Sequence, residues 1–150
     1  VTSNMSLKMQ KNYNIHIDDD FLLEDFISGS AISNIYKIKK NINLTSEEIY
    51  KKYKEKDSTA IEVIEGFIKC LAESLTDFAV TFIPGNGILL AGSLIRTIYP
   101  NINKDEFCDL FMKSHYDVHK LMLDKISIGI ITKEKTPLYG NLNLYKKINN

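Results

Sequence analysis

The stretch from Ile83 to Arg96 constrains the fold more than any other part of this sequence. Pro84–Gly87 has the residue types of a turn, and Ile88–Ala91 is a short apolar run typical of a strand that is buried on both faces. Gly92 and Ser93 end this run, and apolar residues at helical spacing follow. A strand, a glycine and a helix N-terminus in this order predict a helix-rich α/β fold.

The glycine turn at Gly92 allows two interpretations. Ligands of α/β sheets bind at the carboxyl ends of strands, because the backbone can approach a ligand closely at glycine and a helix N-terminus favours an anion. The alternative is a plain strand-to-helix connection in which glycine allows tight packing. A single glycine turn is a weak signal, so the pattern alone leaves both interpretations open.

Composition limits the classes of partner. The chain has 150 residues, which suggests one domain or a piece of a larger protein, and its 19 basic and 19 acidic residues cancel. The zero net charge argues against nucleic-acid or anionic-membrane binding. There is no apolar stretch that could span a bilayer and no signal-peptide core in the first ten residues. We therefore expect a cytoplasmic protein with no nucleic-acid or membrane partner, and reduced, buried thiols at Cys70 and Cys108.

The first half of the chain is expected to be helical after a mobile lead-in over residues 1–14. The acidic run Asp18–Asp20 lacks the spacing of a calcium loop and is expected to cap a helix over Phe21–Phe26. Gly29 then separates this helix from a second one. Gly29 is either a simple kink or a position where backbone N–H groups face a ligand, and both interpretations stay open.

The long helix that begins near Asp57 is the best-defined element. A capping box at Thr45 and Glu48 predicts a short, solvated helix before it. In the long helix, two apolar strips predict contact with the core on more than one side. The first strip has 3-4 spacing and the second lies beside it: Ile61, Ile64, Ile68, Leu71, Leu75, Phe78 and Phe82, then Val63, Phe67 and Cys70.

The second half is expected to hold three more helices and one more strand. Asn103 or Asp105 can cap the first helix, and the last one follows Pro137. His115 and His119 share a helix face, but without an HExxH pattern we favour packing or exposed histidines over metal ligands. The second strand is Ile126–Ile131. Two strands make an incomplete sheet, so further strands must come from the N-terminal residues or from a larger protein.

Three segments stand out when they are taken together. They are Glu24–Tyr36 (EDFISGSAISNIY), Gly87–Arg96 (GILLAGSLIR), and the strand Ile126–Ile131 followed by Leu138–Gly140 (LYG). Together they resemble segments of the bacterial ATP-dependent glucokinases. They occur in the order of that family and cover about residues 15–147. The resemblance implies an actin-like, ribonuclease-H-like architecture with two lobes that close on glucose and ATP. Residues 15–150 would be most of the C-terminal lobe.

The resemblance also implies site residues. The family glutamate that contacts sugar hydroxyls falls on Glu24, for which a solvated helical residue is the alternative. Gly29, Gly92 and Ser93 would border the nucleotide. The family has a second glycine where this chain has Ser93, which puts the closest backbone approach in doubt; Ser93 would instead cap the helix or offer its hydroxyl to the nucleotide.

The implied activity is transfer of the γ-phosphate of ATP to the 6-hydroxyl of glucose, with Mg²⁺ carried by ATP. The family's D-x-G-G-T, N-D and E-G-G-H segments are expected before Val1, so the chain alone would be inactive and would need the N-terminal half. One alternative is a non-catalytic remnant that binds sugar, nucleotide or a protein partner. Another is a helix-rich interaction domain with a chance resemblance. Formation of a homodimer stays open.

Overall fold

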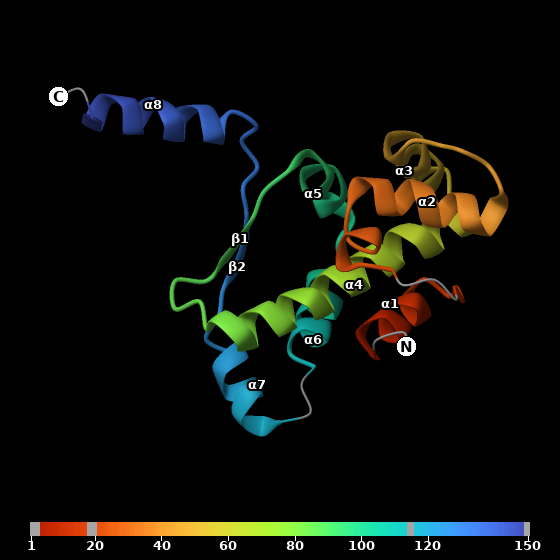
Figure 1. Ribbon diagram of the computed structural model, residues 1–150, viewed down its shortest axis with the longest axis horizontal. Coiled ribbons are helices and arrows are strands. Elements are labelled where there is room, and N and C mark those ends of the chain that lie inside the picture. The colour runs from red at the N-terminus through yellow and green to blue at the C-terminus, as the bar shows by residue number, and fades with distance from the viewer. Residues whose placement is uncertain (1–3, 18–20, 114–115, 149–150) are drawn as a thin grey trace.

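The computed structural model describes residues 4–17, 21–113 and 116–148. Within them the chain is helix-rich with one small parallel sheet, which confirms the predicted α/β class (Figure 1). No helix among these residues has the length and apolar character needed to cross a membrane. The elements are α1 Asn4–Asn12, η1 Leu23–Asp25, α2 Gly29–Lys40, α3 Ser46–Lys54, α4 Ser58–Phe82, β1 Ile88–Leu90, α5 Ser93–Ile98, η2 Tyr99–Asn101, α6 Lys104–Phe111, α7 Asp117–Leu123, β2 Ile128–Ile130 and α8 Thr136–Ile148.

Helix α4 runs through the middle of the molecule, and α1, α2, α3, α6 and α7 contact it (Figure 1). The side chain of Asp57 caps it by accepting a hydrogen bond from the amide of Ala60 at 2.8 Å. The predicted core strips are confirmed along most of the helix. They are wrong at its end, where Phe78 is 42% and Phe82 is 74% exposed. At the C-terminal end of α4, the neighbouring helices cover only the face that carries Ala79, and the face that carries Phe78 and Phe82 is exposed.

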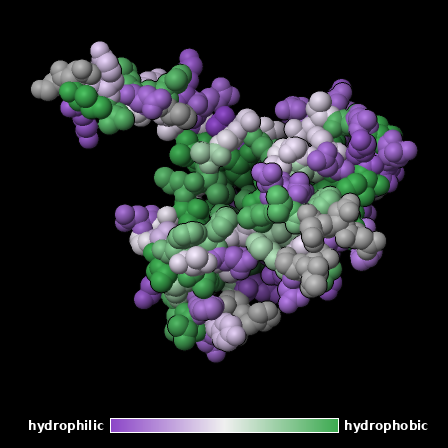
Figure 2. Space-filling view, viewed as in Figure 1, coloured by the Kyte–Doolittle hydropathy of each residue, from purple (hydrophilic) through white to green (hydrophobic). Residues whose placement is uncertain are grey.

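Strands β1 and β2 pair in parallel, with Leu89 opposite Gly129. Both are edge strands of a two-stranded sheet, as the incomplete-sheet prediction requires. Ile88 and Leu90 pack against the helical core, whereas Leu89 points to the other face and is 70% exposed. The expectation that this strand is buried on both faces is therefore wrong. The face that carries Leu89 has no covering helix among the described residues. Figure 2 shows hydrophobic residues gathered between α8 and the helical body.

The turn before β1 depends on Gly87. Its φ is +86°, and a Cβ added there would lie 2.4 Å from Oγ and 2.6 Å from the carbonyl oxygen of Ser127. The same carbonyl accepts a hydrogen bond from the amide of Ile88 at 2.8 Å. The backbone of Gly87 therefore lies close to Ser127 at the point where the pairing of β1 with β2 begins. The predicted turn over Pro84–Gly87 is confirmed by a hydrogen bond from the amide of Gly87 to the carbonyl of Pro84.

The N-terminal segment differs from the expected mobile lead-in. Helix α1 packs on α4 and buries Met9, Gln10 and, just after the helix, Tyr13. The hydroxyl of Tyr13 donates a hydrogen bond to the carbonyl of Phe26. The sequence of α1 does not predict this packing, because part of the buried surface is polar. The side chain of Gln10, for example, is buried and makes hydrogen bonds to both the amide and the carbonyl of Ile17.

Other local predictions have mixed outcomes. The expected helix over Phe21–Phe26 is only the single 3-10 turn η1, and Asp18–Asp20 lie outside the described residues. The capping box of α3 is confirmed, since the hydroxyl of Thr45 accepts the amide of Glu48 and the carboxylate of Glu48 accepts the amide of Thr45. Asn103 rather than Asp105 caps α6.

Helix α8 extends away from the body on residues 131–135 (Figure 1). Its apolar side chains are exposed, with Leu142 the most covered at 48%. The predicted last helix is thus confirmed, but it makes little contribution to the core.

Candidate functional site

The turn after β1 places Gly92 at the N-cap position of α5. Its φ of 135° and ψ of 158° belong to a region that is open almost only to glycine. A Cβ added at Gly92 would meet no atom within 4 Å. Backbone conformation, and not tight packing, therefore requires glycine here, so the packing interpretation is wrong. The open space leaves the backbone accessible, while ligand binding at this turn stays a prediction.

Ser93 is the first residue of α5 and is exposed. The expectation that its side chain caps the helix is wrong, because Gly92 occupies the cap position and no side chain caps α5. The amide of Ser93 lies in the first helical turn, where amides have no acceptor within the helix. Buried Ile95 and Ile98 hold this short helix against the core.

Gly29 is the first residue of α2, and Ser28 caps the helix by accepting the amide hydrogen bond of Ala31 at 3.0 Å. The simple-kink interpretation is wrong, because a helix begins here and only the 3-10 turn η1 precedes it. A Cβ at Gly29 would meet only the hydroxyl of Ser46, at an ordinary 3.9 Å. Neither conformation nor packing requires glycine at this position, and its amide lies in the first turn of α2, where amides have no acceptor within the helix.

Glu24 lies in η1 and is exposed. It lines a shallow depression together with Leu22, Leu23 and Ile27. Its neighbour Asp25 is used structurally, since its carboxylate accepts the amide hydrogen bond of Leu22 at 2.8 Å. Within the described residues, no hydrogen bond or ion pair engages Glu24, so its carboxylate is available to solvent or to a ligand.

The aromatic ring of Phe26 anchors the segment that carries Glu24. This ring is buried, with its centroid 5.5 Å from that of Phe21 and 6.3 Å from that of Tyr13. Because Tyr13 also donates to the carbonyl of Phe26, the position of η1 depends on α1 and its C-terminal end. This support could not be predicted from the sequence, because Tyr13 lies in the segment that is expected to be mobile.

A single hydrophobic cluster joins the two candidate segments. Phe26 of the first segment and Ile95 and Ile98 of α5 belong to the same buried group. Among the described residues, no hydrogen bond directly links Glu24 or Gly29 to Gly92 or Ser93. The structure therefore fixes both segments to one core, with Glu24, Gly92 and Ser93 exposed and Gly29 half-buried.

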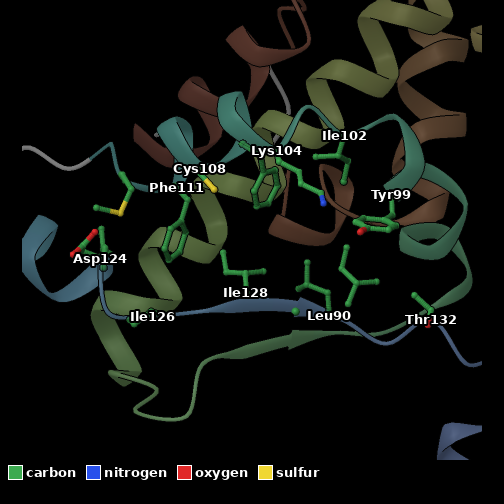
Figure 3. A pocket seen from close by; sticks show the side chains of 15 residues that line it. Leu90, Tyr99, Ile102, Lys104, Cys108, Phe111, Asp124, Ile126, Ile128 and Thr132 are labelled. Carbon is green, nitrogen blue, oxygen red and sulfur yellow. The ribbon is translucent and has the colours of Figure 1, made fainter.

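Sequence reasoning missed a cavity of about 540 Å³ between α6 and β2 (Figure 3). Cys108 lines this cavity and is exposed, so the expectation that both thiols are buried is wrong for Cys108 and confirmed for Cys70. Burial raises the pKa of the Cys70 thiol to about 12. The cavity forms between elements far apart in sequence, and no local pattern predicts it.

Of the two histidines, His115 lies outside the described residues. The ring of His119 packs edge-on against Tyr116, with 5.2 Å between the ring centroids. The described ranges gather no group of three His, Cys, Asp or Glu side chains that would hold a metal ion.

Comparison with known families decides the classification. The glucokinase family model matches residues 9–148, from the middle of α1 to the end of α8. The chain belongs to the glucokinase family. This confirms the resemblance carried by the three sequence segments and excludes a chance match. No curated protein matches the chain. The glucokinase family implies an actin-like fold and ATP-dependent phosphorylation of glucose, typically with Mg²⁺.

Proposed function

We propose that this glucokinase-family chain forms the C-terminal lobe of an enzyme that transfers the γ-phosphate of ATP to the 6-hydroxyl of glucose. The family match over residues 9–148 is the observation that supports this proposal. The 150-residue sequence contains no D-x-G-G-T, N-D or E-G-G-H segment. The phosphate loop and the catalytic base would therefore come from an N-terminal half that acts together with this lobe.

In this proposal Glu24 binds the sugar. A carboxylate accepts strong, charge-assisted hydrogen bonds from hydroxyl groups. Glu24 is exposed and makes no competing ion pair within the described residues, whereas Asp25 beside it is engaged by the amide of Leu22. Of these two carboxylates, Asp25 has a structural partner and Glu24 has none within the described residues, which supports Glu24 as the sugar ligand.

Gly92, Ser93 and Gly29 would border the nucleotide. The open backbone at Gly92 allows a close approach, and the first-turn amides of α5 and α2 are donors for an anionic group. The Ser93 hydroxyl adds a further donor. Mg²⁺ would arrive with ATP and be held mainly by phosphate oxygens and water.

Phosphoryl transfer depends chiefly on positioning and on stabilisation of charge at the transferred group. This lobe would bind and orient glucose and ATP, and closure against the N-terminal half would exclude water from the reacting groups. The base that accepts the proton of the sugar hydroxyl lies outside this lobe in our proposal. The 150-residue chain should therefore bind glucose and nucleotide without transferring phosphate.

The first test is glucose-dependent ADP formation by the 150-residue chain with ATP and Mg²⁺, run beside thermal melts with glucose or ADP. We expect no turnover, but stabilisation by each ligand, on the order of 2.7 kcal/mol at one hundred times its dissociation constant. Turnover by this chain alone would refute the assignment of the base to another half. Melts unchanged by both ligands would refute the sugar- and nucleotide-binding roles.

Glu24→Gln tests the sugar role. The substitution keeps the shape and removes the charge, so we expect stabilisation by glucose to fall while stabilisation by ADP is unchanged. Glu55→Gln is the matched control, because Glu55 is also an exposed glutamate but lies at the end of α3. If both variants respond to glucose like the parent chain, Glu24 is only a solvated residue.

A non-catalytic remnant is the second candidate function. Ser93 in the position of the family's second glycine favours it. Ser93→Gly distinguishes the two: a nucleotide site that has lost affinity through the serine should bind ADP more tightly in this variant. Unchanged ADP affinity would mean that the serine is compatible with the family site.

A further inference from the structure

The cavity between α6 and β2 has the properties of a binding site separate from the glucose and nucleotide positions. Its volume of about 540 Å³ is in the range of small-molecule sites. Its walls are mainly apolar: Phe107 and Phe111 of α6 and Ile128 and Ile130 of β2 line it. Figure 3 shows Phe111 and Ile128 on opposite walls. The two aromatic side chains are nearly fully buried, at 8% and 4% exposed, so the walls are fixed by the core.

One part of the cavity carries a cation. In Figure 3 the Lys104 side chain extends toward Tyr99, and its Nζ lies 5.9 Å from the centroid of that ring. Lys104 has no carboxylate partner within the described residues. The carboxylate that lines the cavity belongs to Asp124, which Figure 3 places at the opposite end from Tyr99. The ammonium group at this end is therefore available to a ligand.

We propose that this cavity binds a medium-chain carboxylate, with the carboxylate group at Lys104 and the alkyl chain along Phe111 and Ile128. Charge complementarity selects an anionic head group at the Lys104 end, and the aromatic and aliphatic walls select an alkyl tail. The carboxylate at the far end disfavours a ligand with a second anionic group there. This inference goes beyond the proposed kinase function and does not depend on it.

Calorimetric titration of the 150-residue chain with octanoate, hexanoate and octan-1-ol tests the proposal. Burial of the tail predicts about fourfold weaker binding for each methylene removed, so hexanoate should bind about sixteenfold more weakly than octanoate. Octan-1-ol has the same tail length without the charge and should bind more weakly than octanoate. Equal affinity for octanoate and octan-1-ol would overturn the role of the cation.

Lys104→Gln isolates the head-group contact. Because Lys104 is partly screened by solvent, we expect octanoate affinity to fall about threefold to fivefold and octan-1-ol affinity to stay unchanged. Lys51→Gln is the matched control, since Lys51 is an exposed lysine on α3 that does not line the cavity. Lys104 is the first residue of α6, where a positive charge opposes the helix dipole, so its removal should not unfold the helix.

Cys108 provides an independent measure of occupancy. Its thiol is exposed and lines the cavity, whereas the Cys70 thiol is buried, so iodoacetamide should react selectively with Cys108. Saturating octanoate should slow this alkylation, and the same octanoate concentration should protect less in Lys104→Gln. An unchanged alkylation rate with octanoate bound would place the ligand elsewhere and overturn the proposal. Displacement of octanoate by ADP would also overturn it, because the cavity would then belong to the nucleotide site.

Discussion

Replacement of Gly66 by alanine tests how α1 is attached to the core. Gly66 lies in the interior of α4, where alanine normally favours the helix by about 1 kcal/mol. Here, however, an added Cβ would lie 2.4 Å from Cδ1 of Tyr13 and 2.9 Å from the carbonyl oxygen of Asn12. Tyr13 is fully buried and cannot move without breaking its hydrogen bond to Phe26.

The clash should exceed the gain in helix propensity. Complete loss of a buried aromatic side chain costs about 3–5 kcal/mol, and a neutral hydrogen bond contributes about 1 kcal/mol. Displacement of Tyr13 loses part of both, and the helix propensity of alanine offsets about 1 kcal/mol of that loss. We therefore expect Gly66→Ala to lower the free energy of unfolding by about 2 kcal/mol, which lowers Tm by roughly 4–8 °C in a chain of this size.

Urea unfolding followed by circular dichroism measures this effect in a double-mutant cycle. In the Tyr13→Ala background most of the clash is gone, so Gly66→Ala should cost less than in the parent chain, with a coupling energy of at least about 1 kcal/mol. Gly140→Ala in α8 is the matched control, because nothing lies within 4 Å of the added Cβ and alanine should only favour that helix. Additive effects in the cycle, or a stabilising Gly66→Ala, would refute the packing of Tyr13 against α4.

Two further predictions follow from the backbone and the buried titratable groups. Gly92→Ala should lower the free energy of unfolding by about 1–3 kcal/mol, because only glycine tolerates its backbone angles. Gly85→Ala should be near neutral, since Gly85 has open space and no positive φ; equal effects in chemical denaturation would contradict the strain argument. Burial raises the pKa of Cys70 to about 12 and that of Tyr13 well above its usual value. The unfolded chain therefore loses these protons first as pH rises, so stability should fall above about pH 9, by up to about 1.4 kcal/mol per pH unit for each group. Urea unfolding between pH 8 and 11 measures this slope, and constant stability across that range would show that neither group is desolvated.

The local features of the fold could be predicted because their causes lie within a few residues. Thr45, Asp57 and Asn103 each cap the helix predicted to follow them, since a cap uses hydrogen bonds to amides two or three residues away. The turn ending at Gly87 and the start of α5 after Gly92 were predicted for the same reason. The order of three short segments was enough to indicate the family that the comparison confirmed.

The candidate site was predicted only as a set of positions. The residue types at Glu24, Gly29, Gly92 and Ser93 indicated a ligand edge, but not how that edge is supported. The support comes from a hydrogen bond between Tyr13 and Phe26, which are thirteen residues apart. Neither hydrophobic periodicity nor a capping pattern predicts this hydrogen bond, because it forms only when α1 packs on α4.

Tertiary structure alone decided which apolar residues are covered. The continuous apolar run Ile88–Leu90 is typical of a strand that is covered on both faces, yet Leu89 is exposed because no helix among the described residues covers its face of the sheet. Cys108 and the cavity that it lines depend in the same way on how α6 meets β2. Local sequence determined most of the helices and both strands, because hydrogen bonds and caps act over one helical turn. The docking of α1, the short turn η1 and the burial of each side chain depend on which elements the whole chain brings together.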